Sequence, residues 1–252
     1  MSEVVLRRVR AWATTTEETP LDSDEAWAAW VKNPRPLGRE GKPPVAFLPP
    51  AVRRRASRLT RLMLETAFAC TTDEERGTVR TVFASRHGAI HVAIKILASI
   101  AREEAVSPLQ FSHSVHNAQA GLFSIAAGNR EASSSIAAGA DTFAHGFLEA
   151  VLQLERRPEQ AVLLVTGDEP IPENLAHLIE EPEAAYSTAL LLARGGPGTR
   201  LRFTLEASGA PHKQRDWPDA IEFVRFALSD EPELSLESGR RRWRWERIGD
   251  AD

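Results

Sequence analysis

The stretch Ser133-Ser-Ser-Ile-Ala-Ala-Gly-Ala140 decides the fold of this chain, together with the segment from Asp141 to Leu154. Its residues 134–138 run into a glycine, which is the pattern of a strand that enters a tight turn. The segment 141–154 places apolar side chains at helical spacing. The sequence therefore predicts a strand, a turn and a buried helix, with Ala140 at the point where the helix begins.

Strands and helices alternate along the rest of the chain. Strands are predicted over 4–12, 81–85, 161–167, 184–193, 201–206 and 240–248, and helices over 59–70, 90–101, 117–127 and 219–228. This alternation predicts an α/β layered fold. We expect the strand over 201–206 to be the hairpin partner of the strand over 184–193, because the turn Gly195-Gly-Pro-Gly198 joins them.

The composition is that of an ordinary globular protein and excludes several classes of function. The chain has 252 residues, of which 42% are hydrophobic, and its formal net charge of -4 gives no general signal for nucleic acid or a membrane surface. No apolar run is long enough to span a bilayer and the first residues do not read as a signal peptide, so we expect a cytoplasmic location. The single Cys70 excludes an intrachain disulfide, and no Cys/His spacing fits a zinc site, so no metal or cofactor is expected.

Arginines crowd the predicted start of the helix over 59–70. They include Arg53, Arg54, Arg55 and Arg58. Positive charge at the start of a helix opposes the helix dipole, so this placement needs a reason outside the helix. Two interpretations remain open, a solvated face and a docking surface for an acidic partner.

Four blocks of the sequence together resemble the N-terminal half of the β-ketoacyl synthases of the thiolase superfamily. They begin at Phe47, Phe83, Asn117 and Val162. The third block, Asn117 to Ala140, can be laid on the active-site region of that family without a gap. The resemblance spans residues 45–195 and implies a thiolase-like layered fold. It further implies that residues 1–252 form a single ketosynthase-like domain, in which 199–252 are a shortened C-terminal extension.

Ala140 occupies the position at which a ketosynthase carries its nucleophilic cysteine. A methyl group cannot form the thioester on which acyl transfer depends, and the neighbouring Gly139 cannot either. Active members of the family also carry two histidines in their C-terminal half, whereas only His212 follows Ala193 here. The resemblance therefore implies a relative without catalytic residues, in which Ala140 marks a vestigial nucleophile position.

More closely, the chain resembles the chain-length-factor subunits of aryl polyene biosynthesis. This resemblance implies a non-catalytic subunit that pairs with an active ketosynthase, shapes its acyl tunnel in polyene or fatty-acid-like biosynthesis, and meets an acyl carrier protein. Ketosynthases pair their active-site strand across the dimer axis, which here implies an interface at Ser133, Ser134, Ser135, Ile136 and Ala137. The residues placed against the partner's tunnel, where they would limit product length, are His87, Ile90, His91 and Ile94. The arginines would then attract the acidic carrier.

Two other functions remain open. An acyltransferase or hydrolase would use a serine of the 133–135 run or Thr142, although no G-x-S-x-G motif is present. A homodimeric protein that binds acyl carriers would need no nucleophile at all. Neither alternative is excluded by the composition.

Two smaller patterns favour structural roles. His113 and His116 are expected to cap or to form buried hydrogen bonds, and His116 to fix the backbone beside Ala140, because no further metal ligand stands at a suitable spacing. The segment 240–247 mixes arginine with tryptophan, and it predicts an alternating strand with Trp243 and Trp245 on one face. A nucleic-acid surface is the less favoured interpretation, because the chain is acidic overall.

Overall fold

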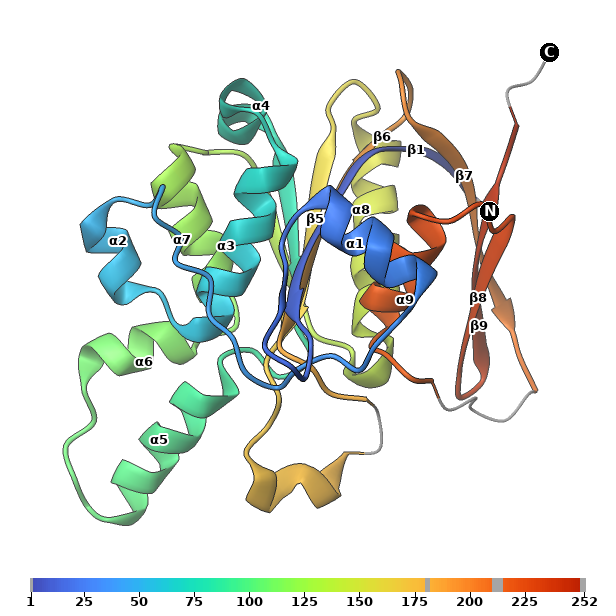
Figure 1. The fold of residues 1–252 in the computed structure, drawn as a ribbon. Helices are drawn as coiled ribbons and strands as arrows, with labels where there is room; N and C mark the ends of the chain where they lie inside the picture. Colours follow the sequence, from blue (N-terminus) through green and yellow to red (C-terminus); the bar gives the residue numbers. More distant parts are fainter. Residues whose placement is uncertain (1, 180–181, 210–214, 250–252) are drawn as a thin grey trace.

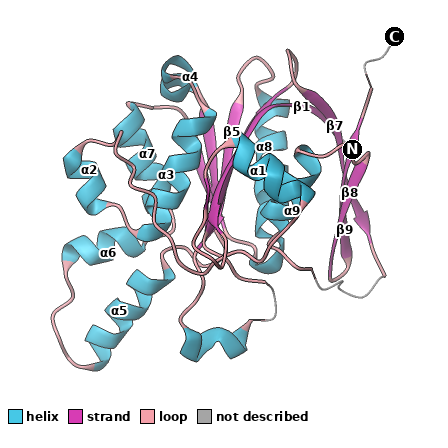
Figure 2. Cartoon of the chain, in the orientation of Figure 1, coloured by secondary structure: helices cyan, strands magenta, loops and turns pink. Residues whose placement is uncertain are grey.

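A mixed sheet forms the centre of the molecule in the computed structural model, which describes residues 2–179, 182–209 and 215–249 (Figures 1 and 2). Its nine strands in these residues have the order β4-β3-β5-β6-β1-β7-β9-β8, with β2 paired to β1. β4, β3 and β5 are parallel, and the other neighbours are antiparallel. The strands are β1 (Ser2–Thr14), β2 (Pro20–Leu21), β3 (Arg80–Ala84), β4 (Ser133–Ile136), β5 (Val162–Asp168), β6 (Tyr186–Ala193), β7 (Thr199–Ala207), β8 (Glu233–Ser238) and β9 (Arg241–Arg247).

Helices cover both faces of the sheet and confirm the α/β layered fold (Figure 2). They are α1 (Asp24–Lys32), α2 (Pro50–Arg55), α3 (Arg58–Cys70), α4 (Asp73–Thr78), α5 (Ile90–Ala101), α6 (Pro108–Ser114), α7 (Ala118–Ala127), α8 (Thr142–Arg156) and α9 (Asp219–Ala227), with two 3-10 turns, η1 (Gly139–Asp141) and η2 (Glu173–Leu178). Within the described ranges, no helix has the length and apolar character needed to cross a membrane.

α3 packs on one face of the sheet, over β1, β5 and β6. The Ser57 hydroxyl caps its start by accepting a hydrogen bond from the Thr60 backbone N–H at 3.1 Å. The apolar stripe predicted for this helix is buried, and Cys70 at its end is fully buried. α7 lies beside α3 and ends at Gly128, whose φ of 64° is the left-handed conformation typical of a helix C-terminus.

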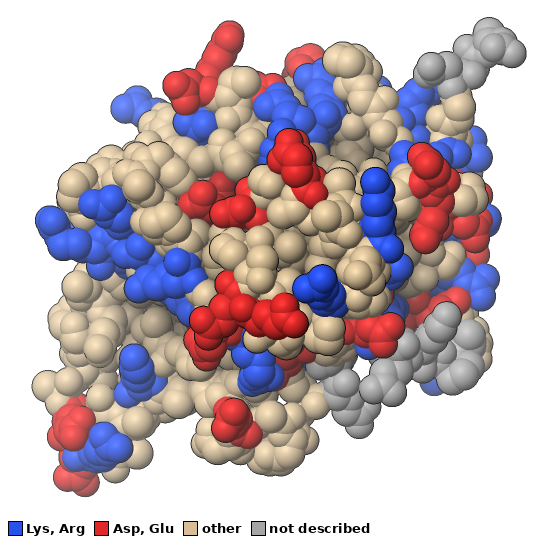
Figure 3. All heavy atoms as spheres, viewed as in Figure 1, with Lys and Arg blue, Asp and Glu red and all other residues tan. Residues whose placement is uncertain are grey.

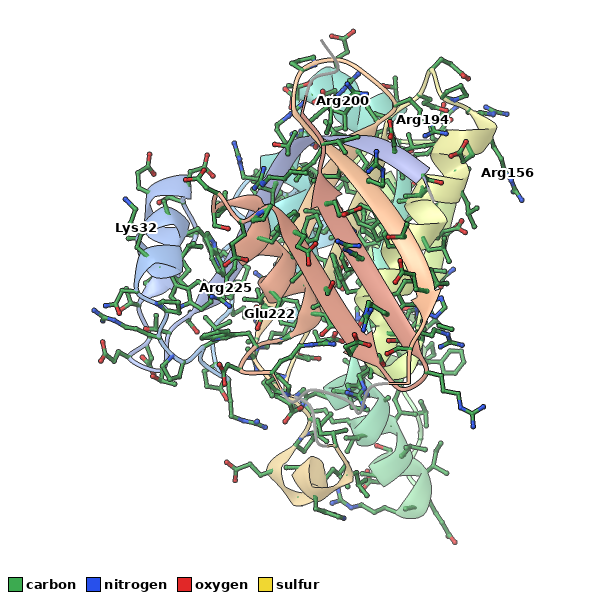
Figure 4. The ribbon with its side chains drawn as sticks, turned by 90° about the vertical axis from the view of Figure 1, so that its right-hand side faces the viewer. Lys32, Arg156, Arg194, Arg200, Glu222 and Arg225 are labelled. Atoms are coloured by element: carbon green, nitrogen blue, oxygen red, sulfur yellow. The ribbon has the colours of Figure 1, made fainter. Side chains whose placement is uncertain are left out.

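α8 lies on the opposite face, over β3 and β5, with α9 beside it. The strands β7, β9 and β8 curve around these helices, so that α8 lies between the centre of the sheet and its last strands (Figure 1). Figure 4 shows the last strands in front of α8. Trp243 and Trp245 of β9 point into this core and are fully buried, Trp245 against Phe143 and Phe147 of α8. The alternation predicted for this strand is therefore confirmed.

The expectation that β7 is the hairpin partner of β6 is wrong. β1 lies between them, because its residues 5–13 pair with β6 and its residues 2–6 pair with β7. Gly198 lets the turn pass over β1, since a Cβ at this position would overlap the Leu6 carbonyl oxygen. A glycine-rich turn predicts that the chain reverses, but it does not specify which strand comes to lie beside the returning one.

Candidate functional site

A cleft of about 590 Å³ opens where the parallel strands β3 and β5 end. Ala140 and Phe143 line it from the start of α8, and His87 lines it from the turn after β3. Asp168 at the end of β5 and Tyr186 at the start of β6 complete this part of the wall. The carboxyl ends of parallel strands and the N-terminus of a helix meet here, which is where α/β proteins commonly bind ligands. The cleft around Ala140 is therefore the candidate site.

The turn before α8 holds Ala140 at the wall of the cleft. Gly139 has a φ of 59°, which only glycine adopts readily. The Thr142 hydroxyl fastens the turn, donating to the Gly139 carbonyl at 2.7 Å and accepting from the Ala138 N–H at 3.0 Å. A methyl group thus lies where a side chain would experience the helix dipole, and it has no atom that can attack an acyl group.

Asp141, the residue after Ala140, is bound from β9 rather than from within α8. Its carboxylate accepts hydrogen bonds from Arg241 Nη1 at 3.1 Å and from the Trp243 indole N–H at 3.2 Å. The side chain is almost completely buried. These bonds fix the last strands of the sheet to the start of α8, beside the candidate site.

Two adjacent carboxyl groups lie buried in the cleft at the end of β5. Asp168 Oδ1 accepts hydrogen bonds from the Ser85 hydroxyl and the Arg86 backbone N–H, both at 2.8 Å. Burial raises the pKa of Asp168, and burial likewise raises the pKa of the neighbouring Glu169, because a charged carboxylate loses its hydration there. The pair therefore keeps a proton at a pH at which an exposed carboxyl has released it.

Histidines anchor the backbone next to the cleft. His116 Nε2 lies 2.8 Å from the Ser85 carbonyl oxygen, which confirms that His116 fixes the backbone near this site. His91 Nε2 lies 2.8 Å from the Pro170 carbonyl oxygen, which joins α5 to the segment after β5. His87 lines the cleft itself. Of the residues that the structure describes, no group of three or more His, Cys, Asp or Glu side chains could hold a metal ion.

The predicted tunnel residues are only partly brought together. His87 lies in the cleft and His91 is held by Pro170, as described above. Ile90 and Ile94 lie in the first turns of α5 and are half-buried. His212, the single histidine near the C-terminus, lies outside the described residues.

The strand β4 lies at the edge of the sheet, and β3 is its only neighbour among the described strands. The Thr81 and Ser85 N–H groups donate to the Ala132 and Ile136 carbonyls, both at 3.1 Å. Alternate residues of a parallel strand bond to the same neighbour, so Ser133 and Ser135 direct their backbone N–H and C=O groups away from β3. Ala137 follows the strand and is exposed. The edge is therefore free for a further strand among the described residues.

The serine side chains of β4 point to opposite faces, as their alternation predicts. Ser134 Oγ donates to Glu149 Oε1 at 2.8 Å on the α8 side. Ser133 and Ser135 line a second cavity of about 430 Å³ beside α7. No histidine among the described residues is hydrogen bonded to these hydroxyls or to Thr142, so they lack the general base that activates a serine nucleophile.

The arginines at 53–55 do not lie at a helix start, contrary to the sequence-based expectation. The helix breaks at Ala56 and Ser57, so these residues form the last turn of α2, where positive charge is favoured by the helix dipole. Arg58 begins α3, but its guanidinium donates to the Gly41 carbonyl at 2.9 Å and lies against Glu40. Figure 3 shows Lys and Arg atoms gathered over α2. A positive surface therefore exists there, but it does not arise from arginines placed unfavourably at the start of a helix.

Sequence reasoning did not identify Asp168, Glu169, Thr166 and Tyr186 as site residues. The available signal was the position of two acidic residues directly after the buried strand β5, at the end of the sheet where ligands bind. Their burial also depends on segments distant in sequence. Tyr186 O–H, for example, lies 3.4 Å from Asp168 Oδ2.

Comparisons with known proteins agree with this geometry. A family model described as β-ketoacyl synthase, N-terminal domain, matches residues 27–246. No curated protein sequence matches the chain.

Solved structures share the fold. One chain of the complex between the ketosynthase ApeO and its chain length factor ApeC, from Xenorhabdus doucetiae, is 28% identical, with a TM-score of 0.80, and the match covers 98% of this chain and 100% of that one. A chain of the ishigamide ketosynthase/chain length factor is 13% identical, with a TM-score of 0.62 and coverage of 82% and 68%. A β-ketoacyl synthase from Burkholderia phymatum STM815 is 13% identical, with a TM-score of 0.59 and coverage of 85% and 66%.

Proposed function

The chain belongs to the β-ketoacyl synthase family, and from this premise we propose that it is a non-catalytic subunit, a chain length factor, of an active ketosynthase. The observation that carries the proposal is Ala140, a methyl group at the start of the helix that borders the cleft. The 28% identical chain comes from a complex of a ketosynthase with its chain length factor, which supports the same arrangement here. The subunit would act in polyene or fatty-acid-like biosynthesis.

The open edge of β4 is the proposed centre of the interface. Ser133 and Ser135 present backbone groups there that no described strand pairs with, and the equivalent strand of a ketosynthase would extend the sheet across both subunits. Ser134 and Ile136 would keep their bonds to β3, and Ala137 would lie at the end of the contact. Strand addition of this kind gives affinity through main-chain hydrogen bonds.

An exposed apolar surface on α5, α6 and α7 would enlarge this interface. Its large side chains are more than one third exposed: Leu97, Ile100, Leu109, Phe111, Val115 and Ile125. α6 contacts α5 and α7, and α7 contacts β4, so this surface continues from the free edge of the sheet. A surface of this kind on a globular protein usually marks a protein interface.

The first turns of α5 would set the length of the product. Ile90 and Ile94 are half-buried one helical turn apart, and we assign them, with His87 and His91, to the wall against the partner's acyl tunnel. A bulky side chain at the end of a tunnel stops a growing chain by steric exclusion. Arg53, Arg54, Arg55 and Arg58 would contribute to the surface that attracts an acidic acyl carrier protein.

The test is co-expression with a ketosynthase that has its complete Cys/His/His set, followed by assay with a carrier protein. We expect the two chains to co-purify and the chain alone to show no condensation. In the complex, Ile94→Ala should shift the carrier-bound products to longer chains by mass spectrometry, while Lys95→Ala, an exposed neighbour on α5, should not. Condensation by the isolated chain would refute the proposal. An unchanged length distribution in Ile94→Ala would remove the role in chain length and leave a scaffold.

A further inference from the structure

Glu169 lines the cleft, and its carboxyl has no hydrogen-bond partner among the described residues. Glu169 is 2% exposed, and no hydrogen bond or ion pair joins its carboxyl group to another described residue. An ionised carboxylate that is buried without a partner costs free energy. For this reason burial raises the pKa of Glu169. A group in this situation is stabilised by any ligand that supplies a hydrogen-bond donor.

Two more polar atoms beside the cleft also lack a hydrogen-bond partner in the part of the chain that the structure describes. The Thr166 hydroxyl belongs to a residue that is 1% exposed, and its oxygen has no hydrogen bond. Asp219 Oδ2 is buried and unpaired, although the other carboxylate oxygen of Asp219 binds Arg215. Thr166 and Asp219 both line the same cleft as Glu169. All three groups can accept a hydrogen bond from a ligand in the cleft.

Arg86 and Arg215 line the cleft, and none of the described guanidinium groups around it is free. Arg215 binds Asp219 and donates to the Glu237 carbonyl at 2.6 Å. Arg39 donates to Glu183 and to the Ile171 carbonyl, both at 2.9 Å. Arg58 is held by the loop around Gly41. No described residue donates to the Glu169 carboxyl, so a ligand that enters the cleft can supply the donor.

The remaining wall suits the body of an organic cation. Phe143, Tyr186 and Trp217 line the cleft, and aromatic faces attract cations as well as apolar groups. The volume of about 590 Å³ is that of a site for a small molecule. Aromatic walls combined with carboxyl groups are the chemistry that recognises an ammonium or amidinium ion.

We propose that this cleft binds a small organic cation, with its amine or amidinium group against Glu169 and Thr166 and its apolar body against Phe143 and Trp217. The inference goes beyond the role as a partner subunit and does not depend on it. It assigns a binding function to the cleft beside Ala140, where no nucleophile is present.

Binding should be linked to pH. Glu169 faces His91 on α5 and Arg58 on α3, which favour its charged form, and Asp168 and Glu40, which disfavour it. A cation binds the ionised carboxylate, so binding must displace the proton that the pair retains. Affinity for a permanently charged cation should therefore rise with pH through the range in which the pair titrates, and then level off.

The experiment is calorimetric titration of the isolated full chain with benzamidine, with benzyl alcohol and benzoate as neutral and anionic probes of similar shape. We expect one saturable benzamidine site at pH 8, and at least about tenfold weaker binding of both other probes, as expected for the loss of a charge-assisted hydrogen bond. Glu169→Gln should weaken benzamidine by a similar factor. Glu173→Gln, an exposed change on η2, should not.

Thr166→Val is a second variant that keeps the volume of the side chain, and it should weaken benzamidine several-fold even if Glu169→Gln does not fold. Absence of a saturable site would overturn the proposal, and so would equal affinity for the three probes. Full benzamidine affinity in folded Glu169→Gln would do the same. The assay needs no ketosynthase, so its failure is distinguishable from failure to assemble.

Discussion

Ala140 and Asp141 together determine what the start of α8 can do. Ala140 lines the cleft and is half-buried, so a side chain introduced there is reachable from solvent. The Asp141 carboxylate is engaged by Arg241 and Trp243, so the helix dipole can act on a group at position 140. Position 140 thus lies at a helix start within the cleft, as a reactive side chain would, but it carries only a methyl group.

Ala140→Cys should create a thiol that reacts with iodoacetamide much faster than the natural Cys70. Cys70 is fully buried, and burial raises the pKa of its thiol to about 12, so the native protein should leave it unlabelled. Peptide mass spectrometry after brief labelling would locate the modification, with the wild-type protein as control. The variant should still not condense acyl groups, because His87 is the one histidine among the described residues that lines the cleft. Turnover by Ala140→Cys alone would contradict this account.

The Asp168–Glu169 pair should make stability depend on pH. Both carboxyl pKa values are raised in the folded state, so the folded chain holds protons that the unfolded chain releases above a pH of about 4.5, the ordinary value for Glu. The free energy of unfolding should therefore fall as pH rises from there through the raised pKa, by up to about 1.4 kcal/mol per pH unit for each proton. Glu169→Gln should flatten the dependence in urea unfolding, and Glu173→Gln should leave it unchanged. An identical pH profile for wild type and Glu169→Gln would contradict the assignment.

For single residues, the sequence predicts which side chain stands at a site better than it predicts the surroundings of that side chain. The position of Ala140 followed from the strand–glycine–helix pattern, which is local. The state of Asp168 and Glu169 did not, because it depends on Ser85, Tyr186 and α5, which the fold brings together. The prediction for the arginines at 53–55 was wrong for a local reason. The helix breaks before Arg58, at Ser57, and the apolar spacing does not reveal this break.

At the scale of elements, β4 combines a paired side and an open side within four residues. Ser135→Pro should remove an N–H on the open side and leave the bonds to β3 intact, so assembly with a ketosynthase should be lost while the chain itself stays folded. Ser135→Ala keeps the N–H and should assemble normally. Ser134→Pro should instead remove a bond to β3 and lower the melting temperature. Co-purification, with circular dichroism as the folding control, separates these cases. Normal assembly of Ser135→Pro would place the interface elsewhere.

The predicted strands and helices agree well with those observed, although α1, α2, α4, α6 and β8 were not predicted. The one strand pairing predicted within the chain, between β6 and β7, is wrong. Buried strands such as β3, β5 and β6 and the amphipathic α3 and α8 carry their pattern within themselves, so the sequence predicts them. The position of β7 depends on β1, which is separated from it by most of the chain and inserts beside β6. Pairing of this kind depends on the whole sheet and cannot be predicted from the sequence of either strand alone.

At the scale of the molecule, residues 199–247 belong to the same sheet and the same hydrophobic core as the rest of the chain. β7, β9 and β8 extend the same sheet and enclose α8 and α9 (Figures 1 and 4). Trp243, Trp245 and Phe203 of these strands share one core with Phe143 and Phe147 of α8. The helix that bears the candidate site is therefore buried by strands from the end of the sequence.

This shared core predicts that the chain unfolds as a single domain. Trp245→Ala should lower the free energy of unfolding by about 3 to 5 kcal/mol, because a large fully buried side chain leaves a cavity. Trp245→Phe should cost clearly less, since it leaves a smaller void and removes an indole N–H that has no partner among the described residues. Urea unfolding followed by tryptophan fluorescence and by far-ultraviolet circular dichroism should give one coincident transition for each protein. If the last strands were a separate unit, Trp245→Ala would produce an early transition in fluorescence alone, with the helices of the rest of the chain retained.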